Sequence, residues 1–278
     1  MTPTSVPTQA QSSTLLTRIV PLPPVSARRA AHLVERNLLV YRRGWVIIVS
    51  GFFEPLFYLL SIGIGIGALV GTVTVDGTVL DYTVFVAPGL LASSAMNGAV
   101  YDSTFNVFFK LKYAKTYDAV LSTPMSAADA AAGEITWALM RGLFYSTTFL
   151  LVMLVLGLVG SPWAVLVLPA CILIGFAFAA VGMAATTYMR GWQDFGFVQL
   201  FVLPMFLFAT TFYPLSTYPE VLQWVVVSTP LYHAVELIRG LTTGFVDGSL
   251  FWHVAYLLVM GLIGLRVAAG RLERLLLT

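Results

Sequence analysis

Residues 164–189 read AVLVLPACILIGFAFAAVGMAATTYM and contain no charged side chain. A stretch of this length and composition predicts a helix that crosses a bilayer, because about 20 apolar residues span the hydrocarbon core. Arg190 follows at once, and residues 195–213 then form another apolar stretch, FGFVQLFVLPMFLFATTFY. Two such stretches joined by a short basic loop are typical of a polytopic membrane protein.

The composition of the whole chain agrees with this interpretation. Of its 278 residues, 58% are hydrophobic and only 10% are charged, whereas about a quarter of the residues of a soluble domain are charged. The sequence therefore predicts an all-α membrane protein with no room for a second globular domain. Six apolar stretches are the predicted transmembrane helices: residues 45–69, 83–107, 134–159, 164–189, 195–213 and 250–268.

The charged residues predict the orientation of these six helices. Thirteen of the fifteen Lys and Arg residues lie on one predicted side: Arg18, Arg28, Arg29, Arg36, Arg42, Arg43, Lys110, Lys112, Lys115, Arg190, Arg266, Arg271 and Arg274. The opposite loops carry one base, Arg239, and mainly acids: Asp76, Asp81, Glu220, Glu236 and Asp247. Because basic loops stay in the cytoplasm, we expect both termini on the cytoplasmic side of a plasma membrane, the inner membrane in a bacterium.

Two segments precede the first predicted span. Residues 1–25 are rich in Thr, Ser, Gln and Pro and lack the apolar core of a signal peptide, so we expect a disordered cytoplasmic tail. Residues 26–44 alternate apolar and basic side chains with a helical period. This pattern predicts an amphipathic helix that lies along the inner headgroups.

Two connections are longer than a helical bundle needs. In the inner one, residues 110–133, a short helix over residues 112–121 is predicted to stop near Pro124. The outer one, residues 214–249, contains two apolar runs that are too short to cross the bilayer and are broken by Pro219 and Pro230. Runs of this kind predict a pair of re-entrant half-helices that protein shields from lipid.

The sequence lacks the motifs of several enzyme classes. It contains no GxxxxGK[ST] phosphate-binding loop, no HExxH, no GxSxG and no cluster of Asp residues that could hold Mg²⁺. The single cysteine, Cys171, excludes a disulfide within the chain. His32, His233 and His253 stand in separate segments, so we expect no metal site. Use of ATP would require another protein.

Glu54 stands inside the first predicted span, where an acidic residue costs roughly 3 kcal/mol on insertion scales. Asp102 and Arg141 are predicted at similar depth in the second and third spans. We therefore expect Glu54 and Arg141, with Asp102, to form an ionic cluster in the bundle. The cluster is either a static clamp between helices or a polar gate that contacts a substrate headgroup at the inner entrance.

Four segments carry a family resemblance by their order and spacing. They are EPLFYLLSIGIGIG at residues 54–67, YTVFVAPGLLASSAM at 82–96, YDAVLSTPMSAADAAAGEI at 117–135 and FYPLSTYPEVLQWVVVSTPLYHAVELIRG at 212–240. Over about residues 30–275 the chain resembles the membrane subunit of a type-2 ATP-binding-cassette exporter, and it is particularly similar to the nodulation-factor and daunorubicin-resistance permeases.

The resemblance implies a homodimer or pseudo-dimer of six-span halves that pairs with two cytoplasmic ATPase subunits and moves substrate outward. ATP and Mg²⁺ belong to the ATPase, so this chain is expected to bind no cofactor and to catalyse no reaction. Residues 26–278 are expected to form the transmembrane domain, and residues 26–44 resemble the elbow helix of the family. No nucleic-acid partner is expected.

The resemblance also assigns roles to two sets of residues. The inner set resembles the coupling helix, which we expect to be a solvated surface that docks into the ATPase: Lys112, Tyr113, Lys115, Tyr117, Asp118, Leu121 and Pro124. The outer set resembles the re-entrant pair that caps the exit: Pro219, Trp224, Pro230, Glu236 and Arg239. Glu236 and Arg239 are three residues apart, a spacing typical of a surface salt pair.

The predicted cargo is amphipathic, because the predicted walls offer aromatic residues and Met with few buried charges. It is either a lipid-linked glycan or glycolipid, or a hydrophobic drug. Two alternatives are an ion-coupled secondary transporter in which Glu54 or Asp102 titrates, and a membrane-embedded lipid-modifying enzyme. The first lacks an evident repeat of broken helices, and the second lacks clustered acid, base or metal ligands.

Overall fold

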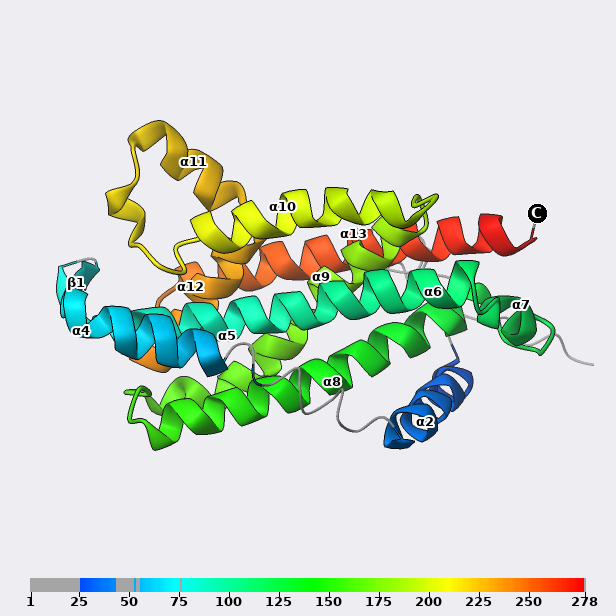
Figure 1. Cartoon of the computed structure of the whole chain (residues 1–278), viewed down its shortest axis with the longest axis horizontal. Coiled ribbons are helices and arrows are strands. Elements are labelled where there is room, and N and C mark those ends of the chain that lie inside the picture. Colours follow the sequence, from blue (N-terminus) through cyan, green and yellow to red (C-terminus); the bar gives the residue numbers. More distant parts are fainter. Residues whose placement is uncertain (1–25, 44–52, 54–55, 76, 278) are drawn as a thin grey trace, which may run out of the picture.

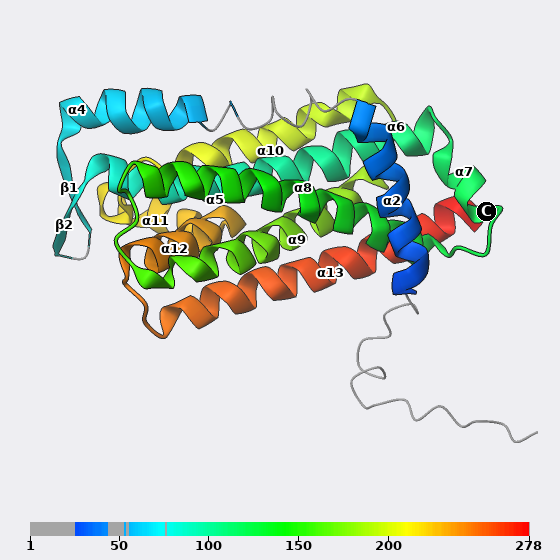
Figure 2. The ribbon, with the colours of Figure 1, turned by 90° about the horizontal axis from the view of Figure 1, so that it is seen from below.

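The computed structural model of the chain describes residues 26–43, 53, 56–75 and 77–277 (Figure 1). The predicted tail, residues 1–25, lies outside this part. The described helices form an elongated bundle, and α2, Ala27–Arg43, crosses one end of it (Figure 2). The structure is mostly helical, as the sequence predicted, apart from one short hairpin of strands β1 and β2, Thr72–Val75 and Thr78–Asp81.

Four stretches of helix are long and apolar enough to cross a membrane. The first runs from Tyr82 to Lys112, because α5 leads through a π-helical turn, η2, into α6. The elements of the four stretches are α5 Tyr82–Tyr101, η2 Asp102–Asn106, α6 Val107–Lys112, α8 Ala127–Val155, η3 Pro162–Leu166, α9 Val167–Thr186 and α13 Ser249–Leu277.

Two further apolar helices are shorter, and they coincide with the first and fifth predicted spans. Residues 44–52, 54 and 55 lie outside the described residues, so the beginning of the first span is not described. The elements are η1 Leu59–Ile66, α4 Gly67–Val70, η4 Trp192–Asp194 and α10 Phe195–Phe208. In the described residues, length and composition thus identify four crossings, or five if a bent pair counts as one, where the sequence predicted six.

The bent pair is the outer connection. After a short turn, η5 (Leu215–Thr217), come α11 (Glu220–Ser228) and α12 (Pro230–Thr243), whose axes differ by 85°. Pro219 immediately precedes α11 and Pro230 opens α12. Proline is favoured in the first turn of a helix and disfavoured further along it, which agrees with a helix that starts after Pro219 and another that starts at Pro230.

The inner connection is shorter than predicted. Lys112 is the last residue of α6, and the separate helix α7 spans only Thr116–Leu121. Helix α8 begins at Ala127, seven residues before the predicted span, because Ser126 and Asp129 form a capping box. The Ser126 hydroxyl accepts a hydrogen bond from the Asp129 amide, and the Asp129 carboxylate accepts one from the Ser126 amide.

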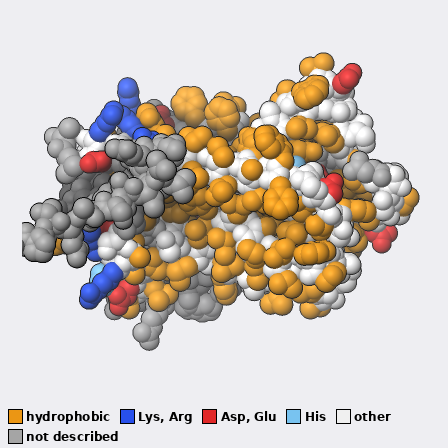
Figure 3. Space-filling view, turned by 180° about the vertical axis from the view of Figure 1, so that it is seen from behind, with side chains coloured by type: hydrophobic (Ala, Val, Ile, Leu, Met, Phe, Trp, Pro, Cys, Tyr) orange, Lys and Arg blue, Asp and Glu red, His pale blue; other side chains and the backbone are white. Residues whose placement is uncertain are grey.

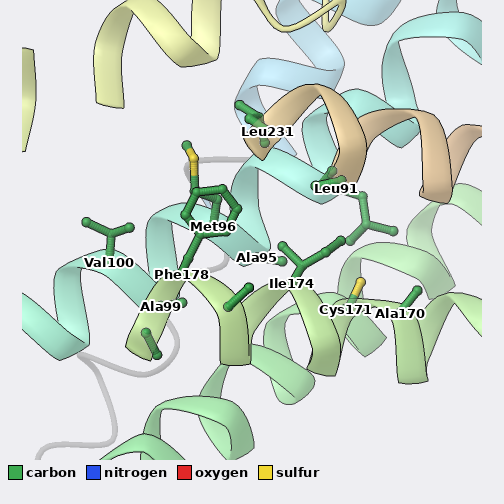
Figure 4. Packing of buried hydrophobic residues seen from close by; sticks show 14 of the residues in the cluster. Leu91, Ala95, Met96, Ala99, Val100, Ala170, Cys171, Ile174, Phe178 and Leu231 are labelled. Carbon is green, nitrogen blue, oxygen red and sulfur yellow. The ribbon is translucent and has the colours of Figure 1, made fainter. Parts of the chain in front are cut away.

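Helices α5 and α9 form the centre of the bundle, where small and large apolar side chains alternate (Figure 4). Helix α13 comes so close to α9 that a Cβ on Gly264 would lie 2.8 Å from backbone atoms of Ala180 and Val181. Glycines at such contacts allow helices to pack backbone to backbone in a membrane. Many large apolar side chains are exposed on the outside of the bundle as well, as on the face that Figure 3 shows.

The two ends of the bundle differ in their elements and in their charge. Helices α2 and α7 and the C-terminus lie at one end, and the β-hairpin and α11 lie at the other (Figures 1 and 2). Figure 3 shows a face on which hydrophobic side chains cover the middle and the visible Lys and Arg side chains gather at one end. This is the distribution of a protein that crosses a membrane along the bundle axis.

Candidate functional site

Asp102 and Arg141 form an ion pair inside the bundle. Arg141 on α8 donates from Nη1 to Asp102 Oδ1 over 2.7 Å and from Nη2 to the Tyr145 hydroxyl over 3.2 Å. Only 14% of the Arg141 side chain and 11% of the Asp102 side chain are exposed. Asp102 opens the π-helical turn η2, and such turns are frequent at functional sites. Glu54, the third predicted member, lies outside the described residues.

A cavity of about 150 Å³ lies beside this pair. Helices α5 and α8 supply its polar lining, and Tyr58 and Phe206 contribute from the two shorter apolar helices. We call it the polar cavity; its polar lining residues are Ser93, Ser94, Asn97, Tyr101, Asp102, Arg141 and Tyr145. Asn97 Oδ1 is buried and has no hydrogen-bond partner within the described chain. A buried acceptor in this state favours a ligand that brings a donor.

A second cavity, of about 740 Å³, is lined mainly by α9 and α10, and Met260 of α13 also reaches it. Its walls are almost entirely apolar and include Phe201 and Met205; Arg190 and Asp194 are the two charged residues in its lining. Helix α10 contributes to both cavities, with Phe206 in the polar one and Phe201 in the apolar one. Gln199 on α10 donates a hydrogen bond of 2.9 Å to the Tyr101 hydroxyl.

The predicted coupling residues lie together at the basic end. The side chains of Lys112, Tyr113 and Lys115 are exposed, as is Pro124, whose carbonyl accepts a hydrogen bond from Arg29 on α2. Tyr117 is different, since it is fully buried. The expectation that Tyr117 belongs to a solvated docking surface is therefore wrong. The side chains of Asp118 and Leu121 lie outside the described part.

Tyr117 is buried next to a second ion pair that the sequence did not reveal. Lys110 donates from Nζ to both carboxylate oxygens of Glu134, over 2.7 and 2.9 Å, and to Asn37 Oδ1 over 3.1 Å. Asn37 Nδ2 in turn donates to Glu134 Oε2 over 3.1 Å. We call Asn37, Lys110 and Glu134 the inner polar joint. Burial first, and the Glu134 carboxylate second, raise the pKa of Tyr117 well above its ordinary value.

The sequence interpretation missed the joint because it placed both charged residues at the edges of a loop. Lys110 was taken only as a topology signal, and Glu134 was taken as the first residue of a span. The sequence contained a usable signal, since Ser126 and Asp129 have the spacing of a capping box. A helix that starts there carries Glu134 two turns inside the protein, where a carboxylate needs a partner.

The outer set contains a buried arginine rather than a surface pair. Arg239 is 4% exposed and donates to Glu236 Oε1 over 2.5 Å, to the Thr210 carbonyl over 2.7 Å and to the Phe85 carbonyl over 3.3 Å. These bonds join α12 to α5 and to the segment after α10, which corrects the expected surface salt pair. By contrast, Trp224 is 76% exposed.

Two of the three histidines meet, although the sequence placed them in separate segments. The Nδ1 atoms of His233 on α12 and His253 on α13 lie 2.7 Å apart, and the Tyr256 ring stacks on His233 at 3.9 Å. The described residues contain no group of three or more side chains that could hold a metal ion. The pair therefore acts here as a hydrogen-bonded contact between two helices.

Comparison with known proteins identifies the family of this helical bundle. Residues 29–243 match the family model described as ABC-2 type transporter. The chain is 31% identical over 246 residues to Nodulation protein J of Sinorhizobium fredii, which covers 88% of this chain and 92% of that protein. It is also 29% identical over 247 residues to Nodulation protein J of Rhizobium leguminosarum bv. viciae, covering 87% and 93%.

A more distant relative carries a more general name. The Inner membrane transport permease YadH of Escherichia coli is 25% identical over 211 residues, which covers 74% of this chain and 78% of that protein. The family model covers well over half of the chain, and the first relative exceeds 30% identity over most of both proteins. This chain therefore belongs to the ABC-2 type transporter family, as a permease.

Proposed function

We propose that this permease is the membrane half of an ATP-driven exporter that moves a glycolipid or lipid-linked glycan outward. Two copies of the chain pair with two separate ATPase subunits, which bind ATP and Mg²⁺. The observation that carries the substrate class is the presence of two cavities that α10 helps to line, one polar and one apolar. An amphipathic molecule needs both environments.

The polar cavity favours a hydroxyl-rich headgroup over a hydrophobic drug. Its lining offers hydroxyl, amide, carboxylate and guanidinium groups, which match the mixed donors and acceptors of a sugar. The charges of Asp102 and Arg141 neutralise each other, so the cavity has no net charge to attract a strongly ionic solute. The apolar cavity is large enough to take the lipid part.

Six crossings and a cytoplasmic position of both ends are part of this proposal, and the arrangement of the described helices supports them. The outer connection leaves α10 and enters α13 at the same end of the bundle (Figure 1), so α11 and α12 dip in and return rather than cross. In this proposal the two shorter apolar helices cross the membrane as well as the four long ones, which makes an even number of passes. Helix α2 and the described end of α13 lie at the basic end of the bundle, which in this proposal faces the cytoplasm.

Lys112, Tyr113 and Lys115 form the surface that we propose for ATPase docking, and α2 is the elbow helix in the inner headgroups. Closure of the ATPase dimer on ATP moves α7 and shifts the two permease copies between an inward-closed and an outward-conducting arrangement. The permease itself contributes binding groups and a path.

The test uses the tagged chain, purified with the ATPase subunits that accompany it and placed in proteoliposomes. We expect ATP-dependent movement of a fluorescent lipid-linked oligosaccharide and little movement of a fluorescent anthracycline. Asn97→Leu should reduce transport of the lipid-linked oligosaccharide at least about tenfold, because a pocket built around polar groups strongly rejects a ligand whose polar groups it can no longer pair. Thr148→Val is the matched control, since Thr148 bonds the Phe144 carbonyl on α8 and does not line the polar cavity.

Three results would contradict the proposal. If no ATPase subunit co-purifies with the chain, the proposed exporter has no source of energy. Transport driven by a proton gradient alone would favour the ion-coupled alternative, and chemical turnover of the lipid by the purified chain would favour the enzyme. Preference for the anthracycline would keep the permease and change its substrate class.

A further inference from the structure

The inner polar joint is a closed network rather than a simple ion pair. An ammonium group has three N–H donors, and Lys110 directs its donors to Glu134 Oε1, Glu134 Oε2 and Asn37 Oδ1. The exposed fractions are 10% for the Lys110 side chain, 3% for the Glu134 side chain and 2% for Asn37. A network of this kind, filled and shielded from water, permits one arrangement of the helices that carry it.

Four separate elements meet at this point. Asn37 comes from α2, Lys110 from α6 and Glu134 from α8. Tyr117 brings in α7, because its side chain is fully buried and near enough to the Glu134 carboxylate for that charge to raise the pKa of the phenol. Helix α7 has only six residues, too few to be stable alone. Its position therefore depends on tertiary contacts, which include Tyr117 at the joint and, just after the helix, the bond from Arg29 to the Pro124 carbonyl.

The joint and the polar cavity lie on the same two helices. Asp102 precedes Lys110 by eight residues on the continuous helix Tyr82–Lys112, and Arg141 follows Glu134 by seven residues on α8. The two helices thus run antiparallel and are linked by two ion pairs, about two helical turns apart. A change in the relative position of the helices at one pair must alter the other.

We propose that the inner polar joint positions α7 and the polar cavity relative to each other, so that Lys110, Glu134 and Asn37 are the residues that pass movement of α7 to Asp102 and Arg141. This inference rests on the proposed function, because the movement of α7 comes from the ATPase. The residues of the joint do not touch substrate and act only through the helices they hold together.

Energetics support a role beyond stability. Replacing a buried ion pair by well-packed apolar residues is often neutral or stabilising, whereas removing one partner is strongly destabilising. A joint that served only to hold the fold could therefore be replaced by an apolar pair without loss of transport. The directional hydrogen bonds of Lys110 fix one position of the helices relative to each other. An apolar contact does not, since the hydrophobic effect has no direction and apolar surfaces can slide past each other.

The experiment compares wild type with the double variant Lys110→Met/Glu134→Leu, which avoids an unpaired buried charge. Spin labels on cysteines introduced at Leu39 and Ala119, both exposed, report the distance between α2 and α7 in the permease alone. The single native Cys171 is buried and does not compete for the label. In the complex, the readouts are basal ATPase rate, glycolipid-stimulated ATPase rate and transport.

We expect the double variant to fold and assemble with an unchanged basal ATPase rate. Its label distance should broaden, and stimulation by glycolipid should fall about fivefold or more, the size of a typical coupling between sites. The charge-swapped variant Lys110→Glu/Glu134→Lys keeps an ion pair and should recover part of the stimulation.

A narrow distance and full stimulation in the double variant would overturn the proposal. Broadening with full stimulation would overturn it as well, because the joint would then be only structural. If wild type shows no substrate-stimulated ATPase at all, the proposed function fails; the distance measured in the permease alone then tests the joint, and a narrow distance in the double variant overturns it.

Discussion

The two ion pairs between α8 and the helix Tyr82–Lys112 use the same chemistry in different surroundings. Asp102 and Arg141 border a cavity, together with Asn97, whose buried Oδ1 has no hydrogen-bond partner within the described residues. Lys110 and Glu134 are sealed, and Asn37 completes their hydrogen bonds. The difference shows that an ion pair in a membrane bundle can hold helices together or present groups to a ligand, depending on whether its remaining bonding capacity is filled.

The largest expected effect breaks the sealed pair. Glu134→Ala leaves the Lys110 ammonium buried without its carboxylate, and loss of one partner from a buried pair costs about 3–5 kcal/mol. We expect a marked fall in unfolding temperature of the purified permease in detergent. Lys110→Met/Glu134→Leu should recover most of it. Equal loss in the single and double variants would show that shape rather than charge holds this region.

Breaking the cavity pair should affect transport more than stability. Arg141→Leu removes the hydrogen bonds to Asp102 and Tyr145, but the cavity allows water to reach the remaining carboxylate. We expect a stability loss of about 1–3 kcal/mol and a larger relative loss of glycolipid transport in proteoliposomes. A loss of stability as large as that of Glu134→Ala would contradict the contrast between an open and a sealed pair.

The two asparagines provide a matched test of the same contrast. Asn37→Ala removes a donor and an acceptor from the sealed network and should cost about 1–3 kcal/mol. Asn97→Ala removes an acceptor that has no partner in the described chain and should leave stability nearly unchanged while it weakens glycolipid binding. Denaturation of both variants measures the change in stability, and fluorescence titration with labelled glycolipid measures the change in binding.

The smallest effect concerns pH. The pKa of Tyr117 is raised in the folded protein, first by burial and second by Glu134, from an ordinary value of 10.0. The folded state then holds the phenolic proton where the unfolded state loses it, so stability from this group is complete below pH 10 and falls as pH rises above it. Tyr117→Phe should reduce the loss of stability above pH 10 and should change stability little at pH 7. Tyr113→Phe, at an exposed residue, should leave the loss above pH 10 as it is in wild type.

Outcomes of an alkaline titration can separate the two tyrosines. Thermal unfolding between pH 8 and 11 would measure the slope of stability for wild type, Tyr117→Phe and Tyr113→Phe. An identical slope in all three would mean that Tyr117 reaches solvent more easily than its burial indicates.

Local features of the sequence were enough for several elements. The apolar stretches predicted the four long helices, the alternation of apolar and basic residues predicted α2, and Pro219 and Pro230 predicted the broken outer pair. Each of these depends on residues within a few turns of one another, where composition and helical period act directly. Their boundaries were less accurate, since the cap at Ser126 was overlooked.

Contacts between distant residues needed the tertiary structure. Lys110 meets Glu134 across 24 residues, Asp102 meets Arg141 across 39, and Arg239 reaches the Phe85 carbonyl across 154. The predicted depth of the two residues in their spans could place Asp102 beside Arg141. It could not show that this pair borders a cavity whereas the pair of Lys110 and Glu134 is sealed. Composition by itself specified a membrane bundle with one basic end, because hydrophobicity and charge sort each segment independently. The partners of its buried charges depend on which helix faces pack together, and only the folded bundle fixes that packing.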